Sequence, residues 1–543
     1  EDFWLKAPTC RGVEHLMYSA KKMAMMRRVL TRNLQLCRAE SGTCALTSYL
    51  TCDRLGTTTR CFSSAIQERV SEEKMRYPFS TRPDPFVSLE KDILSFDPSI
   101  PIQRAESPPR SWYTHPSLSE FERQSVFLKN WAAVDVLRID KPGEFQTGTI
   151  AGQPYIITCQ EAESQKPQRR SKASPSSNAD VTNVANDENS AVSTNGKLVY
   201  KAFYNLCTHA GSCLVTNFGM DGERSGFARK RESSSACSKT ESLGRSPIDG
   251  DVLVGNTTSS SRLIGCPYHG WRFNLDGRLV VTTDMKGIEN FKNNKFNLKP
   301  IKLSIKGPVI YLNFDQEAAK ETEMLSASSG CPEYQVFEDI LQQHEYEHDF
   351  SDLELVQSRE YVLDCNWKVF AENYGDGCYH CSYAHPVLAA NINEEAYSTK
   401  LLSPKISAQI APPSESGTTD RFGKRSALYT FVYPNMMYNR YGPWLDTNLV
   451  KPLDDNRCVV QIDWFLAKDY LSGKERTDYI ETSLKSSEVV QQEDIFLCEN
   501  VQRGMRSNGF SRGRYVPGRQ QSCFHFHQKL VEDYRREISS QYA

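Results

Sequence analysis

The stretch Asn366–His385, NWKVFAENYGDGCYHCSYAH, decides how the rest of the sequence is organised. It contains two histidines, His380 and His385, and Asp376 lies one helical turn before the first of them. A helix across this stretch would place Glu372, Asp376 and His380 on one face, because residues four apart in a helix stack above one another. We therefore expect one helix to present a histidine and two carboxylates together.

The second histidine requires a break in this helix. His385 lies five residues beyond His380, so a regular helix would rotate it off the face of the first histidine. We expect a bulge or break near Tyr383 that lets both imidazoles meet one ion. Two histidines and one carboxylate are the ligand set of mononuclear iron(II) sites that react with O2. On this stretch alone, the alternative is a pair of ordinary surface or hydrogen-bonded core histidines.

Length and composition narrow the class of protein. The chain has 543 residues, which predicts about two to four domains with ample core. Its net charge is -2 and both signs are mixed, so no basic stripe indicates a nucleic acid partner. We expect no membrane span, because no run of about 18 apolar residues occurs. The 17 cysteines are scattered, which favours reduced thiols and a metal site over a disulfide framework.

Residues 1–85 are predicted to be a leader that does not belong to the folded protein. Between Met23 and Gln67, arginines far outnumber acidic residues, and serine and threonine are frequent, as in organellar transit peptides. The motif Arg60-Cys-Phe-Ser-Ser64 resembles a mitochondrial processing site. We therefore predict localisation to the mitochondrial matrix in preference to the chloroplast stroma. A disordered cytosolic tail is the alternative.

Two segments further along the chain, residues 161–197 and 219–261, are predicted to be polar insertions. Both are rich in Ser, Asn, Lys and Glu and poor in apolar residues, so they cannot bury enough surface to order themselves. The flanking residues, such as Tyr155–Ile157 and Leu198–Tyr200, have strand character. The insertions are therefore expected to loop out of a β-rich domain.

Two short motifs supply a second set of metal ligands. Cys207-Thr-His209 and Cys266-Pro-Tyr-His269 pair two thiolates with two imidazoles. This set suits a Rieske [2Fe–2S] cluster, with both cysteines on one iron and both histidines on the other. A structural zinc site uses the same ligand types and is the alternative. The Gly-Trp271 that follows the second motif matches the Rieske signature, and the second insertion accounts for the 56 residues between the motifs.

A Rieske motif pair followed about 110 residues later by a His/His/Asp cluster resembles the α subunit of Rieske non-haem iron oxygenases. The resemblance implies a third iron ligand on a late helix. Asp494 lies within an apolar stripe at helical spacing, where a carboxylate is costly unless it binds a cation or a donor. The stripe consists of Val490, Leu497, Cys498, Val501 and Met505. We predict His380, His385 and Asp494 as the triad; Glu493 is the runner-up, and a buried salt bridge is the alternative role.

The resemblance also implies a catalytic residue that carries electrons between the two metal centres. In this family, a carboxylate near the first iron histidine hydrogen-bonds across a subunit boundary to a cluster histidine of the neighbouring subunit. Its usual position is three residues before that histidine, where this chain has Gly377. We predict Asp376 in this role, with Glu372 as the alternative, although a regular helix would turn Asp376 by about 100° from the usual direction.

Motifs outside the ligands narrow the resemblance to the choline monooxygenase family. They include Cys365–Phe370, Tyr438–Trp444 and Cys498–Gly504, and the resemblance runs from about residue 108 to the C-terminus. It implies an enzyme that oxidises choline to betaine aldehyde, the first step of glycine betaine synthesis. The implied co-substrate is O2, the implied electron donor is reduced ferredoxin, and the implied assembly is a head-to-tail homotrimer that brings one subunit's cluster near another's iron.

The substrate is the least determined part of this prediction. A quaternary ammonium has no hydrogen-bond donor, so its recognition relies on aromatic faces. Tyr441 and Trp444 are predicted walls of such a cage, and core packing is the alternative. Other candidate functions are an oxygenase for a carnitine-like amine or an aromatic acid, and a Rieske electron carrier without catalysis. About 270 residues follow the second cluster motif, which argues against a carrier.

The predicted fold class is α+β. An antiparallel β Rieske [2Fe–2S] domain is expected over residues 130–315. The catalytic domain is expected over residues 316–543, with an antiparallel sheet flanked by helices that carry the ligands of the mononuclear Fe(II). Residues 86–129 are predicted to be an N-terminal segment that joins the catalytic domain.

Overall fold

The structure is a computed structural model. It describes residues 85–162, 190–192, 197–215, 253–256, 263–315, 332–344, 346, 348–415 and 425–541. All of them belong to one compact unit, Pro83–Ala543. The predicted leader, residues 1–85, therefore lies outside the described residues except for its last position.

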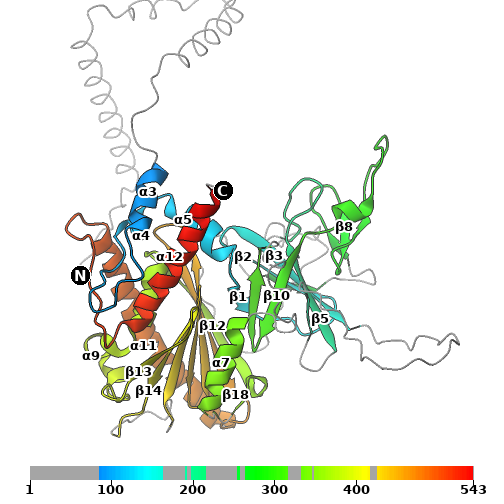
Figure 1. Cartoon of the computed structure of the whole chain (residues 1–543). Coiled ribbons are helices and arrows are strands. Elements are labelled where there is room, and N and C mark those ends of the chain that lie inside the picture. The colour runs from blue at the N-terminus through cyan, green and yellow to red at the C-terminus, as the bar shows by residue number, and fades with distance from the viewer. Residues whose placement is uncertain are drawn as a thin grey trace, which may run out of the picture. The chain divides into compact units, whose positions relative to one another are not determined.

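An eight-stranded antiparallel sheet forms the body of the first domain (Figure 1). Its strands follow the order β1-β11-β10-β5-β3-β2-β6, and β4 pairs with β5. They are β1 (Ala132–Val136), β2 (Glu144–Ile150), β3 (Gln153–Glu161), β4 (Ser190–Val192), β5 (Leu198–Tyr204), β6 (Leu253–Asn256), β10 (Pro300–Lys306) and β11 (Val309–Asn313). Strands β4 and β6 fall inside the segments predicted to be insertions, so part of each insertion joins the sheet. Pairing with a neighbouring strand provides hydrogen-bond partners for backbone N–H and C=O groups of these strands. Amino-acid composition does not reveal such pairing.

A smaller sheet carries the loops of the predicted cluster. Its three antiparallel strands are β7 (Leu263–Gly265), β8 (Arg272–Asn274) and β9 (Leu279–Val281), and the 3-10 helix η2 (Asn293–Phe296) follows them. A separate buried core lies here, with Phe203, Trp271 and Phe273 among its members. Cys207 and Cys266 belong to the same core. The two cysteines are therefore enclosed by apolar side chains rather than by solvent.

The catalytic domain is built on a seven-stranded antiparallel sheet. Its order is β12-β18-β17-β16-β15-β14-β13, so six consecutive strands form a meander and β12 closes one edge. The strands are β12 (Leu353–Leu363), β13 (Ser398–Ser403), β14 (Ile406–Ala411), β15 (Ala427–Val432), β16 (Met436–Tyr441), β17 (Trp444–Pro452) and β18 (Cys458–Ala467). Nearly every residue of β14, β17 and β18 is buried. Since alternate side chains point to opposite faces, both faces of this sheet must be covered.

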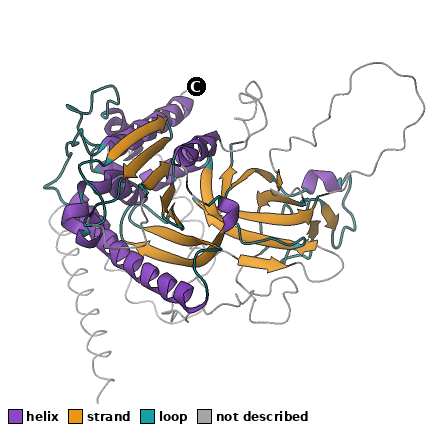
Figure 2. Ribbon diagram, turned by 90° about the horizontal axis from the view of Figure 1, so that it is seen from below, coloured by secondary structure: helices purple, strands orange, loops and turns teal. Residues whose placement is uncertain are grey.

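Helices cover both faces of the catalytic sheet. They are α3 (Pro85–Leu94), α4 (Ser111–Thr114), α5 (Leu118–Glu122), η1 (Arg123–Phe127), α7 (Pro332–Gln343), η3 (Phe350–Asp352), α8 (Trp367–Asp376), η4 (Gly377–Tyr379), α9 (Cys381–Ala384), α10 (Pro386–Ala389), α11 (Gly473–Met505) and α12 (Gln521–Gln541). Helix α7 packs on β13, β14 and β15, whereas α12 packs against α8, which also contacts β17 and α11. Figure 2 shows that the long helices accompany this sheet and that the cluster-bearing domain is mainly strands. The predicted α+β class is confirmed.

Other general features agree with the sequence. Within the described ranges, no helix has the length and apolar character needed to cross a membrane. The cysteines in those ranges are all unpaired thiols.

The segment before β1 is held to the catalytic domain by a buried ion pair. Lys368 Nζ lies 2.6 Å from Glu122 Oε1, and the side chains are 0% and 2% exposed. Trp367 Nε1 donates to the other carboxylate oxygen of Glu122 at 2.8 Å. A charge pair buried this deeply is strongly destabilising to break, because either partner alone would be an uncompensated charge in the interior.

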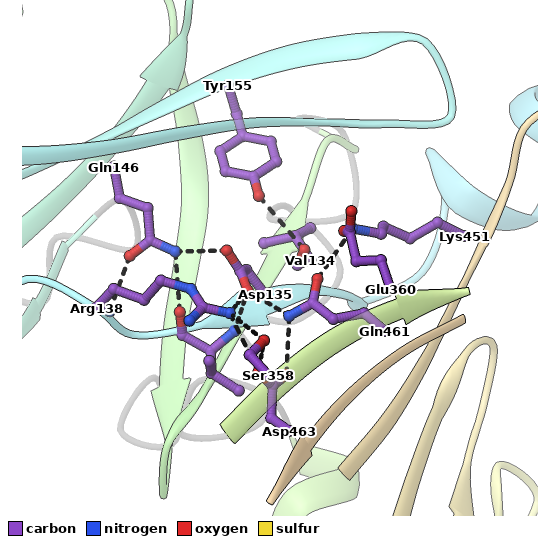
Figure 3. Close-up of polar contacts among 11 residues, drawn as sticks. Val134, Asp135, Arg138, Gln146, Tyr155, Ser358, Glu360, Lys451, Gln461 and Asp463 are labelled. Carbon is purple, nitrogen blue, oxygen red and sulfur yellow. Dashed lines mark hydrogen bonds and ion pairs between the residues drawn. The ribbon is translucent and has the colours of Figure 1, made fainter. Parts of the chain in front are cut away.

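A second buried polar network joins the two sheets (Figure 3). Arg138 Nη2 lies 3.3 Å from Asp135 Oδ1 and 3.1 Å from Asp463 Oδ1, so one cation serves a carboxylate from β1 and a carboxylate from β18. Gln461 Nε2 donates to both carboxylates, at 2.7 and 2.8 Å. Burial raises the pKa of Asp463, against the opposing effect of Arg138. The two domains are thus joined here by specific ion pairs and amide hydrogen bonds, and not by apolar contacts alone.

Candidate metal centres and substrate cavity

A glycine ends the helix before it reaches the two histidines. Helix α8 begins after Asn366, whose side chain caps it by accepting from the Lys368 amide, and it ends at Asp376. Gly377 follows with φ 55° and ψ -135°, a conformation that glycine adopts readily and other residues avoid. The expected single helix therefore ends before the first histidine, and the interruption that separates the two histidines, close to the predicted position near Tyr383, comes later. A second turn in the backbone occurs at His385 itself, between α9 and α10.

We predict that Gly377→Ala lowers both stability and iron content. A Cβ at this position would overlap the side chains of Gln409 and Tyr397, and the positive φ adds strain of about 1–3 kcal/mol. Chemical denaturation should show a loss of that size, and metal analysis should show less mononuclear iron because His380 follows three residues later. Gly518→Ala is the matched control, since its Cβ would meet nothing within 4 Å. Wild-type stability and iron content in Gly377→Ala would contradict the prediction.

The three predicted iron ligands converge. One ligand atom from each of His380, His385 and Asp494 lies within 4.8 Å of the other two. His385 Nε2 is 3.0 Å and His380 Nε2 is 3.7 Å from the same Asp494 oxygen. Metal–ligand distances of about 2 Å allow one ion to sit between atoms at these separations. The donor set therefore fits a mononuclear iron(II), and these residues remain our predicted ligands.

The runner-up Glu493 holds the other side of the same imidazole. Its Oε2 lies 2.7 Å from His385 Nδ1, so the opposite nitrogen, Nε2, is directed at Asp494. Burial lowers the pKa of His385, but Asp494 and Glu493 outweigh it, and the pKa is raised. The site therefore favours a positive charge. A carboxylate behind a ligating histidine fixes the ring orientation and increases its basicity, which is the role that Glu493 can fill.

Helix α11 carries Asp494 as predicted, but the predicted apolar stripe is only partly correct. Cys498 is buried, whereas Val501 is 46% exposed. The buried residues of the helix are Ser483, Leu484, Gln491, Cys498 and Gln502. Gln502 accepts from the backbone amide of Asn366 at 3.0 Å and donates to a carbonyl of α4 at 3.1 Å. Apolar periodicity could not reveal this face, because the polar residues Ser483, Gln491 and Gln502 occupy much of it.

The two candidates for the electron-carrying carboxylate occupy different surroundings. Asp376 Oδ2 lies 3.7 Å from His380 Nδ1, and its other oxygen accepts from Gln520 at 2.5 Å. Glu372 instead lies 3.1 Å from Nε2 of the buried His527. Of the two, Asp376 is the one beside the iron histidine. This placement supports our choice of Asp376, despite the broken helix.

The cluster ligands lie on two loops that repeat one geometry. The amide of Gly211 donates to the carbonyl of Cys207, and the amide of Gly270 donates to that of Cys266, at 2.9 and 3.0 Å. Both glycines have positive φ, 73° and 75°. The loops bring the rings of His209 and His269 to 4.7 Å between centroids. The cysteines are buried and both histidines are exposed, so the histidines form the solvent-facing edge of the site.

This donor set fits a two-iron cluster better than zinc. A tetrahedral zinc ion would draw all four ligand atoms to within about 4 Å of one another. Across the described ranges, the iron triad is the group whose three ligand atoms lie within 4.8 Å, and no three cluster ligands meet that condition. A two-iron cluster does not require three ligand atoms to be so close, because two ligands bind one iron and two bind the other.

A surface groove of about 900 Å³ opens beside the iron triad. Asp376 and His380 lie in it, and its rim carries the exposed side chains of Tyr379, Tyr383 and Phe496. Tyr383 is 90% and Phe496 is 67% exposed. Large aromatic side chains at this exposure, gathered beside a metal centre, indicate an interaction surface.

A second cavity, of about 140 Å³, lies on the inner side of the triad. Its floor is a row of neighbouring residues across four strands, because Gln409, Tyr429, Asn439 and Asp446 are successive cross-strand partners. Helix α8 and the following loops add Tyr374 and Tyr397, whose hydroxyls donate to Asn439 and Gln409, each at 2.9 Å. His380, His385 and Asp494 also line this cavity, which makes it the space where a substrate would meet the iron.

The predicted cage residues lie elsewhere. Tyr441 and Trp444 are 3% and 0% exposed and are not among the residues that line the cavity. Tyr441 donates to Asp446 and so supports the wall from behind, whereas Trp444 donates to Tyr479 on α11 at 3.0 Å. The tyrosines that do line the cavity, at positions 374, 397 and 429, come from different elements. Tyr374 lies on a helix, Tyr397 in a loop and Tyr429 on a strand, so no single sequence pattern links the three.

Comparison with known proteins agrees with this geometry. A family model described as the ring hydroxylating alpha subunit, catalytic domain, matches residues 350–536. The chain is 33% identical to the chloroplastic choline monooxygenase of Arabidopsis thaliana over 457 residues, covering 84% of this chain and 89% of that protein. It is 28% identical to the chloroplastic enzyme of Spinacia oleracea, covering 81% of each chain. It is 23% identical to the carnitine monooxygenase oxygenase subunit of Escherichia coli K12, covering 80% of this chain and 95% of that subunit.

Solved structures share the fold. The quaternary ammonium Rieske monooxygenase CntA, in complex with an inhibitor, superposes with a TM-score of 0.57 at 20% identity, covering 82% of this chain and 98% of that one. Naphthalene 1,2-dioxygenase from Rhodococcus sp. superposes with a TM-score of 0.56 at 14% identity, with the same coverage.

The comparison corrects one prediction and identifies the family. Five plant relatives are named chloroplastic, which contradicts the predicted mitochondrial localisation; arginine and serine content does not separate the two kinds of transit peptide. The family's α subunits carry a Rieske [2Fe–2S] cluster and a mononuclear iron, as the two donor sets require. The chain belongs to the choline monooxygenase-like family of Rieske non-haem iron oxygenases and is a Rieske-type monooxygenase.

Proposed function

We propose that this protein oxidises the quaternary amine choline to betaine aldehyde, with reduced ferredoxin as electron donor and O2 as co-substrate. The relatives named above act on choline or carnitine, which supports a quaternary amine as the substrate class. The observation that carries the proposal is the small cavity beside the iron triad, where three tyrosines and the carboxylate of Asp446 face one space.

The cavity has the chemistry that a small cation requires. A trimethylammonium group cannot donate hydrogen bonds, so aromatic faces and negative charge must replace its hydration. Tyr374, Tyr397 and Tyr429 supply the aromatic surface, and Asp446, 4% exposed, supplies the charge. At about 140 Å³ the cavity suits a compact substrate and is small for an extended aromatic acid.

We predict that Tyr429→Leu raises KM for choline about tenfold and changes kcat less. Leucine keeps an apolar side chain but removes the aromatic face, whose attraction for a desolvated cation is about 1–2 kcal/mol. Steady-state kinetics would measure both constants. Tyr429→Phe keeps the ring and serves as the control. An unchanged KM in the leucine variant would exclude Tyr429 from cation binding.

In the mechanism that we propose, the chain's own residues bind the iron and the substrate, orient the substrate and exclude water. His380, His385 and Asp494 hold the iron, and Glu493 keeps His385 in the required orientation. The tyrosines hold the ammonium end, so that the hydroxymethyl carbon points to the triad. The bound iron supplies the oxidation chemistry. Enclosure by the sheet floor and by α8 and α11 limits the access of water and so suppresses side reactions.

Electron delivery is proposed to occur between subunits of a head-to-tail homotrimer. The exposed edge of the cluster site, His209 and His269, stands beside Tyr268, which is 67% exposed. The groove beside Asp376 offers exposed aromatic side chains next to the iron histidine. If the exposed edge of a neighbouring copy, with its His209 and His269, docks in this groove, Asp376 would lie between His380 and one of those two histidines.

Turnover with several substrates tests the proposed function. Iron-loaded protein with reduced ferredoxin and O2 would be offered choline, carnitine and benzoate in parallel, and the products would be identified by mass spectrometry. Betaine aldehyde or its hydrate from choline is the expected result. If carnitine alone gives a product, the proposed substrate would become a carnitine-like amine. No product from any of them, with both metal sites occupied, would overturn it.

The relatives' names support a chloroplast location for this chain as well. Import of the full-length chain into isolated chloroplasts, but not into isolated mitochondria assayed in parallel, is the expected result.

A further inference from the structure

Two uncharged amide atoms in the wall of the small cavity have no hydrogen-bond partner. They are the side-chain oxygen of Asn448 and the side-chain nitrogen of Gln491, on residues that are 8% and 5% exposed. An unsatisfied buried polar group costs about 1–3 kcal/mol, and more than about 90% of such groups in folded proteins are paired. The orphan amide donor and the orphan amide acceptor therefore need partners, which a polar ligand in the cavity would supply.

The two atoms come from different elements that line the same cavity. Asn448 lies on β17 two residues after Asp446, so both side chains point to the face of the sheet that forms the floor. Gln491 lies on α11 three residues before the iron ligand Asp494, on the neighbouring helical turn. The wall around Asn448 and Gln491 is thus close to the predicted iron and includes one carboxylate.

We propose that Asn448 and Gln491 form a subsite that recognises a hydroxyl group. The substrate's alcohol would donate to Asn448 Oδ1 and accept from Gln491 Nε2. A hydroxyl is the smallest group that satisfies a donor and an acceptor together. This inference rests on the proposed function and deepens it, because it assigns the alcohol end of choline to named residues.

The same wall discriminates against carboxylates. A carboxylate can only accept, so it would satisfy Gln491 but would place negative charge against the oxygen of Asn448. The carboxylate of Asp446 in the same cavity would add repulsion between like charges. The subsite therefore favours a cationic amino alcohol over a zwitterion that carries a carboxylate at the same distance from the ammonium.

Binding measurements on the loaded enzyme without O2 test the subsite directly. Isothermal titration calorimetry would compare choline with propyltrimethylammonium, in which a methyl group replaces the hydroxyl. We expect choline to bind about tenfold more tightly to the wild type, as hydrogen bonds to otherwise orphan groups allow. In Asn448→Leu and in Gln491→Met this preference should fall toward one, with propyltrimethylammonium binding as well as before or better.

The control comes from the adjacent residue on the same strand. Thr447 points to the opposite face and also has a buried side-chain oxygen without a partner, so Thr447→Val makes a similar change away from the cavity. It should keep the wild-type preference. Absorption of the cluster and the content of mononuclear iron would show that each variant is folded and loaded. If a leucine or methionine variant does not fold, Asn448→Ala and Gln491→Ala add no bulk and carry the same expectation.

The possible results distinguish failure of the subsite from failure of the proposed function. Choline turnover together with an unchanged preference in the Asn448 and Gln491 variants would overturn the subsite and leave the function intact. Equal binding of the two ligands to the wild type would also overturn it, and would indicate that water satisfies the two orphan atoms. Absence of binding and turnover for choline would overturn both proposals.

Discussion

Asp494→Ala is expected to abolish turnover and to empty the mononuclear iron site while the absorption of the [2Fe–2S] cluster stays unchanged. A single oxygen of Asp494 approaches both histidines, at 3.0 and 3.7 Å, and it is the only anionic member of the triad. Without it, two neutral imidazoles would have to hold a divalent ion. The cluster ligands lie on loops of the other domain, so they should not respond. Metal analysis and visible spectroscopy on the same sample provide the measurement.

Glu493→Gln is the matched variant for this experiment. It changes the neighbouring carboxylate, which lies 2.7 Å from the far nitrogen of His385. Groups in this position affect metal affinity about 10–100-fold, so iron should be weakened but still bind at saturating concentration. If iron were instead lost from Glu493→Gln and retained in Asp494→Ala, Glu493 would be the iron ligand and Asp494 the supporting carboxylate.

Asp376→Asn is expected to slow turnover about 100-fold with both metal centres occupied. Asparagine keeps the volume of the side chain but removes the charge that lies 3.7 Å from His380 Nδ1. If Asp376 carries electrons toward the iron, the reduced cluster should persist when O2 and choline are added. Stopped-flow absorption of the cluster measures its reoxidation. Glu372→Gln alters the alternative residue, which pairs with His527, and should leave the reoxidation rate near that of the wild type.

Mixing two defective proteins would show whether the electron crosses between subunits. One protein lacks a cluster ligand, through His269→Ala, and the other lacks the iron ligand Asp494. Head-to-tail trimers assembled from both would contain some pairs with an intact cluster facing an intact iron site. We expect partial recovery of activity after the subunits are mixed and reassembled. No recovery, with mixed trimers present, would contradict transfer between subunits.

The sequence indicated most of the candidate ligands because they lie in short motifs. Cys207 with His209, and Cys266 with His269, lie on single loops, and His380 with His385 lie in one short stretch. Asp494 was identifiable because a carboxylate within an apolar helical pattern needs an explanation. The α+β class was expected from the resemblance that these motifs carry.

The features that sequence reasoning missed depend on contacts between distant segments. Helix α8 ends before Gly377, where the side chains of Gln409 and Tyr397 leave no room for a Cβ. The substrate cavity draws on strands β14 to β17, so its lining follows from register rather than from any motif. Aromatic content near Tyr441 and Trp444 indicated the correct region but not the side chains that face the cavity.

The network around Arg138 determines how this protein can be recombined with its relatives. One guanidinium lies between a carboxylate of the cluster-bearing domain and a carboxylate of the catalytic sheet, 3.3 and 3.1 Å away (Figure 3). A transplanted cluster domain that brings the aspartate but lacks the arginine would place two buried carboxylates together without a cation, which the interior tolerates poorly. A functional chimera must therefore transfer Asp135 and Arg138 as one unit and retain Asp463 in the recipient, whatever the similarity of the iron sites.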